Sequence, residues 1–193
     1  MKSPAVRTRR LRSLGDREIH ALAEVLTDCV AGGASVSFML PITRTKAETF
    51  WREIAVSVDR GERVVIVAED AFGAIVGTVQ LIWAWAENQP HRGEIAKMLV
   101  HRQARRQGIG AALLSAAERC ALEAGKTLLV LDTASGDAER LYARQGWQPV
   151  GVIPEYALLP QGGFCSTTIY FKKLARDAAP AEGESRNYEA GVP

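Results

Sequence analysis

Cysteine and histidine are scarce in this chain of 193 residues, which has three of each. Cys29, Cys120 and Cys165 are widely spaced and form no Cys-x-x-Cys pair, so we expect reduced thiols rather than a disulfide framework. The three histidines do not have the spacing of metal ligands either. We therefore expect no bound metal.

Excess charge and long apolar runs are also missing. A net charge of +2 does not favour general binding to nucleic acid or to a membrane. No run approaches the roughly 18 apolar residues of a membrane helix. The basic N-terminus lacks the apolar segment of a signal peptide. We therefore expect a cytoplasmic protein that binds any anion at a local site and not through its overall charge.

Hydrophobic residues make up 47% of the chain, enough to build one core. We expect one domain over residues 1–174. Apolar anchors vanish in residues 175–193, which predicts a disordered C-terminal tail.

Periodicity and turn residues predict seven strands and four helices, and the order of these elements indicates a mixed α/β (α+β) sheet with helices on its faces. Thr45 and Glu48 have the spacing of a capping box at the start of the second helix, and Gly77 suggests a bulge. The expected strands are 6–14, 63–68, 74–85, 94–100, 127–132, 148–153 and 164–172, and the expected helices are 16–30, 45–60, 108–124 and 137–145.

Residues 94–114 form the most informative stretch, EIAKMLVHRQARRQGIGAALL. A strand-like run leads to a basic loop that closes on Gly108-Ile109-Gly110, and a helix-forming run follows. A helix N-terminus has unpaired N–H groups and partial positive charge, and glycine lets those amides approach a phosphate. The stretch predicts a pyrophosphate site.

Three kinds of phosphate site compete for this loop. A P-loop is excluded because no Lys-Ser or Lys-Thr follows the glycines. A Rossmann dinucleotide site has support from Asp132, which ends the next strand, but Leu113 occupies the third glycine position. A nucleic-acid-binding patch on Arg102, Arg105 and Arg106 would need interleaved aromatic residues or a longer basic face, and neither is present.

Two motifs instead resemble the GNAT acyltransferases over about residues 6–174. Arg105-x-x-Gly108-x-Gly110 resembles the family's Arg/Gln-x-x-Gly-x-Gly/Ala loop, and residues 141–147, LYARQGW, resemble its later LY-x-x-x-GF signature. The resemblance implies the GNAT fold, a mixed, mostly antiparallel seven-stranded sheet flanked by four helices. It also implies direct transfer from acetyl-CoA, as co-substrate, to an amine.

The resemblance extends to the tabtoxin-resistance acetyltransferases of this family, through residues 32–39, 94–100, 131–133 and 167–172. It implies a small amine as acceptor, an amino-acid-like toxin or antibiotic of the tabtoxinine-β-lactam type. We expect no nucleic-acid or membrane partner, and a monomer or homodimer. A Rossmann-type NAD-dependent oxidoreductase and a non-catalytic CoA-binding module are the alternatives.

Three catalytic residues follow from the resemblance. Glu94 and Asp132 map to its proposed catalytic acids, and a carboxylate is useful because a primary amine with a pKa of about 10 is almost wholly protonated at pH 7. Tyr142 would protonate the leaving thiolate. For Asp132, capping of the following helix, binding of loop amides and binding of the substrate ammonium remain open.

Binding residues follow in the same way. The family often has an Asn where this chain has residues 133–136, and Ser135 is the candidate replacement. The glycines at 32 and 33 fit either a mobile lid or a helix C-cap, and the tryptophans fit either an acceptor wall or core packing. The expected acetyl-CoA contacts are Met98, Leu99, Val100, Arg105, Arg106, Gln107, Gly108, Ile109, Gly110, Ala111, Ser135 and Tyr142. The expected acceptor contacts are Ser35, Phe38, Trp83, Glu94, Asp132 and Tyr170.

Overall fold

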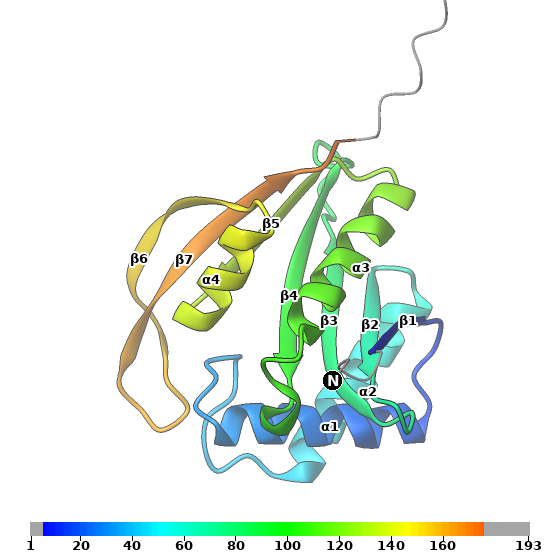
Figure 1. Cartoon of the computed structure of the whole chain (residues 1–193), viewed down its shortest axis with the longest axis vertical. Helices are drawn as coiled ribbons and strands as arrows, with labels where there is room; N and C mark the ends of the chain where they lie inside the picture. Colours follow the sequence, from blue (N-terminus) through cyan, green and yellow to red (C-terminus); the bar gives the residue numbers. More distant parts are fainter. Residues whose placement is uncertain (1–5, 176–193) are drawn as a thin grey trace, which may run out of the picture.

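Seven strands form one sheet in the order β1-β2-β3-β4-β5-β7-β6 (Figure 1). The computed structural model describes residues 6–175, so the expected tail lies outside the described residues except for its first residue. Every neighbouring pair of strands is antiparallel except β4 and β5. The predicted mixed, mostly antiparallel sheet with four helices is confirmed.

The strands are β1 (Arg7–Leu11), β2 (Arg63–Glu69), β3 (Ile75–Trp83), β4 (Arg92–Val100), β5 (Leu128–Thr133), β6 (Gln148–Leu158) and β7 (Phe164–Lys173). The helices are α1 (Asp16–Ala31), α2 (Arg44–Asp59), α3 (Ile109–Glu123) and α4 (Gly136–Arg144), with a 3-10 turn, η1 (Arg102–Ala104). None of the helices within residues 6–175 is long and apolar enough to cross a membrane.

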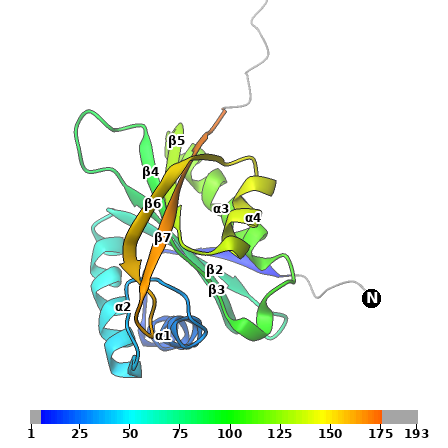
Figure 2. The ribbon, with the colours of Figure 1, turned by 90° about the vertical axis from the view of Figure 1, so that its left-hand side faces the viewer.

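The sheet has a hydrophobic cluster on each face. Successive side chains of a strand point to opposite faces, so Val64 and Ile66 of β2 join the cluster with α3 and α4, whereas Val65 and Val67 join the cluster with α1 and α2. Figure 2 shows the two helix pairs on opposite sides of the sheet. These are called the α3/α4 face and the α1/α2 face below.

Short capping segments end helix α1 and begin helix α2. The glycines that follow α1 serve as its C-cap, since the N–H of Gly33 donates to Val30 and that of Ala34 to Cys29. The capping box predicted at Thr45 is wrong. Thr43 caps α2 by accepting a hydrogen bond from the Lys46 N–H, so the helix begins at Arg44.

The loop between α1 and α2 is tied to the turn between β6 and β7. The Ser35 hydroxyl donates to the Leu158 carbonyl at 2.9 Å, and the Leu40 N–H donates to the Pro160 carbonyl at 2.8 Å. Strand β6 runs to Leu158, beyond the expected end at 153, with a register shift between Ile153 and Ala157. Two segments far apart in sequence therefore lie side by side, as Figure 1 also shows.

Strands β4 and β5 pair only over their first residues, from Arg92 with Leu128 to Glu94 with Val130. Beyond this point β5 pairs only with β7, and β4 only with β3. β4 also carries a bulge, since its register against β3 shifts between Thr78 and Gln80 and Lys97 adopts a φ of 48°. The sheet thus opens between two strands that begin as neighbours.

Candidate active site

Glu94 and Asp132 project from β4 and β5 where these strands separate. Each neighbours a residue buried on the α3/α4 face, Ile95 and Leu131, so both carboxylates point to the α1/α2 face. Val130, the partner of Glu94, lies two residues before Asp132. Both acids are exposed. The structure therefore places the two predicted acids on one face, open to a ligand.

Asp132 is oriented by β7. The Thr167 hydroxyl donates to a carboxylate oxygen of Asp132 at 2.8 Å, and Thr167 is only 2% exposed. Ser135 is the N-cap of α4, because its hydroxyl accepts from the Ala138 N–H at 3.4 Å. Asp132 is therefore not the helix cap. Within residues 6–175 no backbone N–H donates to its carboxylate, so it does not bind loop amides either, and general-base catalysis and binding of an ammonium group remain as its roles.

Tyr142 lies on α4 and is 3% exposed. Its ring contacts Trp147 and Tyr170, with centroid separations of 5.8 Å in both pairs. Burial raises the pKa of Tyr142 well above its ordinary value, and the negative charge of Asp132 raises it further. The phenol stays protonated, as a proton donor requires.

The loop before α3 has the geometry of a pyrophosphate site. Gly108 has a φ of 79° and Arg106 a φ of 62°, and no side chain caps the first amides of this 15-residue helix. Free amides and the helix dipole favour an anion there. The loop therefore fits the diphosphate of acetyl-CoA through the residues from Arg106 to Ala111.

Gly110 and Leu141 connect the two sequence motifs. A Cβ at Gly110 would lie 3.0 Å from Leu141 Cδ2, so this glycine allows α3 and α4 to approach closely. Arg105 turns away from the helix start, since its Nε donates to the Val100 carbonyl at 3.1 Å. The two glycines of the loop therefore serve different purposes, one conformational and one steric.

The remaining expected cofactor contacts stay predictions. Leu99 is buried towards α1 and α2, and Met98 and Val100 pack against the opposite cluster, which leaves the backbone of β4 as the group that a pantetheine arm would meet. Ser135 already uses its hydroxyl as the α4 cap.

Two expected acceptor contacts lie elsewhere. Trp83 and Tyr170 have the strand parity of the α3/α4 cluster, which also contains Tyr142, so they lie on the face opposite to the one that the two acids point to. Trp85 lies beyond the end of β3 and is 95% exposed, so it shares no strand face with Trp83. By contrast, Ser35 and Phe38 lie in the α1–α2 loop, with Phe38 edge-on to Phe50 at 5.2 Å.

Lys97 is the residue of this region that the sequence motifs do not identify. Its ammonium donates to the Ser37 hydroxyl at 3.0 Å and lies 5.9 Å from the Phe50 ring centroid. Burial lowers its pKa, while the charges of Asp132 and Glu94 oppose that effect. A lysine inside the apolar run IAKMLV was the signal available in the sequence.

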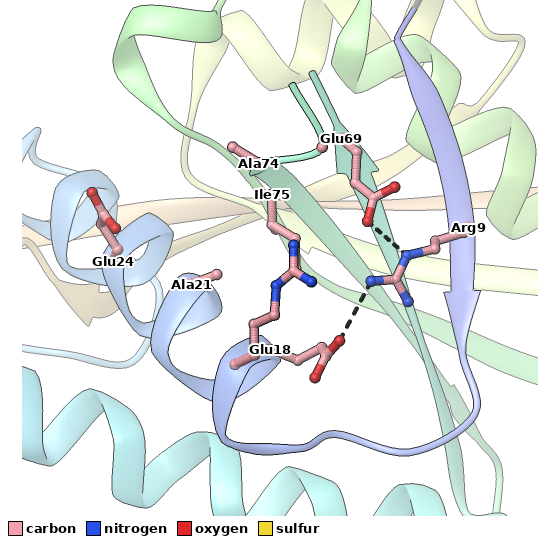
Figure 3. A pocket seen from close by; sticks show the side chains of 9 residues that line it. Arg9, Glu18, Ala21, Glu24, Glu69, Ala74 and Ile75 are labelled. Carbon is pink, nitrogen blue, oxygen red and sulfur yellow. Dashed lines mark hydrogen bonds and ion pairs between the residues drawn. The ribbon is translucent and has the colours of Figure 1, made fainter. Parts of the chain in front are cut away.

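A separate hollow of about 130 Å³ lies beside β1, at the far edge of the sheet (Figure 3). Arg9 pairs there with Glu69 at 2.7 Å and with Glu18 at 3.5 Å. These ion pairs satisfy the charge of Arg9, and neither Glu94 nor Asp132 lines the hollow. Over residues 6–175, no group of three or more His, Cys, Asp or Glu is placed to hold a metal ion.

The fold does not support the dinucleotide-binding alternative. β4, α3 and β5 form one βαβ unit, which explains why the glycine loop resembles a Rossmann loop in sequence. All other strand pairs are antiparallel, whereas a Rossmann sheet is mostly parallel.

Comparison with known proteins agrees with this fold. Residues 60–149 match the family model described as an acetyltransferase (GNAT) domain. Similar solved structures include a candidate phosphinothricin N-acetyltransferase (18% identity, TM-score 0.71, covering 89% of this chain and 100% of the other). Another is yncA, a candidate acetyltransferase from Salmonella typhimurium with its cofactor acetyl-CoA (19%, 0.70, 91% and 98%). A third is a ribosomal-protein-alanine N-acetyltransferase from Brucella melitensis (22%, 0.69, 88% and 99%).

These structural likenesses establish the fold, and the family model covers the segment with the glycine loop and Tyr142. The chain therefore has the GNAT fold, and its residues 60–149 match a GNAT acetyltransferase domain. Together these findings support an N-acetyltransferase with acetyl-CoA as its co-substrate.

Proposed function

We propose that this N-acetyltransferase acts on a small, amino-acid-like amine, such as a toxin or antibiotic of the tabtoxinine-β-lactam type. The observation that carries the proposal is the position of Glu94 and Asp132, on one face and at the point where β4 and β5 separate. Two carboxylates there favour an acceptor that arrives as an ammonium ion.

The chemistry divides among three side chains. Glu94 is the leading candidate for the base that takes a proton from the acceptor ammonium, and Asp132 holds the ammonium or shares that task. The freed amine attacks the thioester carbon, an amide bond forms and the carbon–sulfur bond breaks. Tyr142 gives a proton to the departing thiolate, and the second proton that the nitrogen loses as it becomes an amide restores the phenol through solvent. No acyl-enzyme is required.

The choice of a small acceptor rests on the α1–α2 loop. The structural relatives include one named for phosphinothricin and one named for a ribosomal-protein alanine, so the fold by itself does not choose between small and protein acceptors. Here the loop is hydrogen-bonded at Ser35 and Leu40 to the β6–β7 turn. This bridge from α1 to the far half of the sheet limits the room for a polypeptide.

The test is thiol release from acetyl-CoA over a panel of amines that includes β-lactam amino acids, polyamines and aminoglycosides. Glu94→Gln should lower kcat about 100-fold or more with the best acceptor and leave acetyl-CoA binding intact in a thermal-shift assay. Unchanged turnover in this variant would remove Glu94 as the base. Acetyl-CoA binding without turnover of any amine would favour the non-catalytic module.

A further inference from the structure

Lys97 and Arg63 are half-buried cations of the α1/α2 face that contact only neutral groups. Lys97 donates to Ser37, while Arg63 donates to the Ser57 hydroxyl at 3.0 Å and to Gln80 Oε1 at 2.8 Å. Within residues 6–175, neither cation forms an ion pair. Within the same range, Arg63 reaches a carboxylate only through Ser57, whose hydroxyl donates to Glu62 at 2.8 Å, and Lys97 reaches none. Two cations taken partly out of water without a direct carboxylate partner indicate a place for an anion.

Lys172 shows how this protein treats a lysine with a purely structural role. Lys172 is partly buried, as Lys97 is, but its ammonium pairs with Glu118 at 2.7 Å and also donates to the Gln145 carbonyl. Lys97 has one hydroxyl partner for its three N–H donors. Lys97 therefore differs from Lys172 in lacking an anionic partner, and not in being partly buried.

Gln80 adds a buried donor that lacks an acceptor. It is fully buried, and its Nε2 has no hydrogen-bond partner in the described structure. The amide orientation is set by Arg63, because a flipped amide would turn its N–H groups towards the guanidinium. Gln80 is the cross-strand partner of Ala96, so it lies on the α1/α2 face next to the β4 bulge.

The acids and the cations lie close enough to influence one another. Arg63 of β2 and Glu94 of β4 are both cross-strand partners of Ile82 in β3, so they lie in one row across the sheet, and Lys97 lies three residues further along β4. This region therefore offers both carboxylates and N–H donors on one face of the sheet. An α-amino acid carries the two complementary groups within one small molecule.

We propose that Lys97 is a specificity residue that binds the carboxylate of an amino-acid acceptor, with Arg63 and Gln80 supporting the same anion. The β4 bulge gives Lys97 this position, since the extra residue turns its side chain towards Ser37 and Phe50. The proposal rests on the proposed function, because it assumes that the acceptor amine lies at Glu94 and Asp132.

The experiment compares free amino acids with their α-carboxamides as acceptors for the full-length protein. Methionine, glutamate, lysine and phenylalanine are each used in both forms, with polyamines alongside, and kcat and KM are measured by thiol release. The wild type should prefer the acids. Lys97→Met should lower kcat/KM for the acids roughly 10- to 100-fold, mainly through KM, and leave the amides nearly unchanged.

Three variants separate charge from structure. Lys97→Arg should retain part of the preference for acids. Ser37→Ala removes the hydroxyl partner of Lys97 but keeps its charge, so the preference should persist. Lys126→Met is the matched control, because Lys126 also lies over an aromatic ring, that of Trp83, at 5.2 Å on the other face. If Lys97→Met does not fold, as judged by its thermal midpoint with acetyl-CoA, Lys97→Gln takes its place.

Every outcome decides between the two proposals. Equal losses for acids and amides in Lys97→Met, or a wild type that prefers amides or polyamines, would overturn the role of Lys97 and leave the acetylation of small amines standing. Binding of acetyl-CoA without turnover of any amine would overturn the proposed function, and the role of Lys97 with it.

Discussion

The buried hydroxyl of Thr167 on β7 holds the carboxylate of Asp132 on the neighbouring strand, through a hydrogen bond of 2.8 Å. Asp132 is opposite Ile169 in the ladder, so the bond runs diagonally to a residue two positions along β7 on the same face. One carboxylate oxygen is engaged and the other is available for an acceptor. Thr167 is therefore a positioning residue for the site.

Asp132→Asn and Thr167→Val should both slow turnover, to different extents. Loss of the carboxylate should lower kcat by about 10²- to 10⁴-fold, whereas loss of the orienting bond should cost about tenfold. Thr168→Val is the matched control, because the Thr168 hydroxyl donates to Glu139 of α4 at 2.6 Å instead. Equal kcat values for the two threonine variants in steady-state kinetics would contradict the positioning role.

Tyr142→Phe should lower kcat roughly 100-fold with little change in the thermal midpoint, since the ring still fills its place beside Trp147 and Tyr170. The raised pKa of Tyr142, caused first by burial and then by Asp132, sets the pH dependence. Because the folded phenol keeps its proton above the ordinary value of about 10, kcat should not fall through loss of this proton below that pH. A fall near pH 8 that disappears in Tyr142→Phe would contradict the prediction.

Gly108→Ala should weaken acetyl-CoA binding by disturbing the loop rather than by a clash. The site has a φ of 79° and no atom near the added Cβ, so the cost is the backbone strain of about 1–2 kcal/mol. Gly136→Ala is the control, since Gly136 also has free space but no positive φ, and it begins a helix. Urea unfolding and acetyl-CoA titration should show losses only for Gly108→Ala.

Asp28 of α1 stabilises the segment between β4 and α3, which contains Arg102 and the glycine loop. Its carboxylate accepts from the Arg102 backbone N–H at 2.8 Å and from Arg102 Nε at 2.9 Å. Burial acts to raise the pKa of Asp28, but the hydrogen bonds from Arg102 and the charges of His101 and Arg102 outweigh it, and the net pKa is lowered. Asp28→Asn should therefore destabilise the fold by about 1–2 kcal/mol at neutral pH.

The pH dependence of Asp28 has a definite sign. A lowered folded pKa stabilises the protein above the unfolded value of about 3.9, and the contribution is lost as the pH falls through the lower folded value. The difference in urea midpoint between wild type and Asp28→Asn should thus be constant from pH 7 to 5 and shrink below pH 4. A difference that grew in acid would contradict this account.

Local sequence patterns predicted most of the fold correctly. The apolar stripe of α1, the glycine after it and the β-branched run of β2 each act within one element, where periodicity and conformational preference dominate. The cap of α2 was missed because Thr43 and Thr45 are both good capping residues, and the choice depends on where the chain turns into the helix.

The face of the sheet to which a strand residue points, by contrast, depends on the register of the strand and on its bulges. Trp83 and Tyr170 were expected to contact the acceptor, but pairing in the sheet turns them to the face opposite to the two acids. Lys97 was not singled out, since a lysine in an apolar run marks an unusual position but does not show that a bulge turns it towards Ser37 and Phe50.

The sequence by itself determined the helix start at Gly108, the Leu141–Tyr142 motif and the carboxylates at Glu94 and Asp132, since each is local and depends on residue type and spacing. Only the tertiary structure decided that Ser135 rather than Asp132 caps α4, that Thr167 orients Asp132, and that Lys97 turns towards Ser37 and Phe50. These relationships join residues from different strands and loops. They arise from the register of the sheet and from the separation of β4 and β5, which no single stretch of sequence encodes.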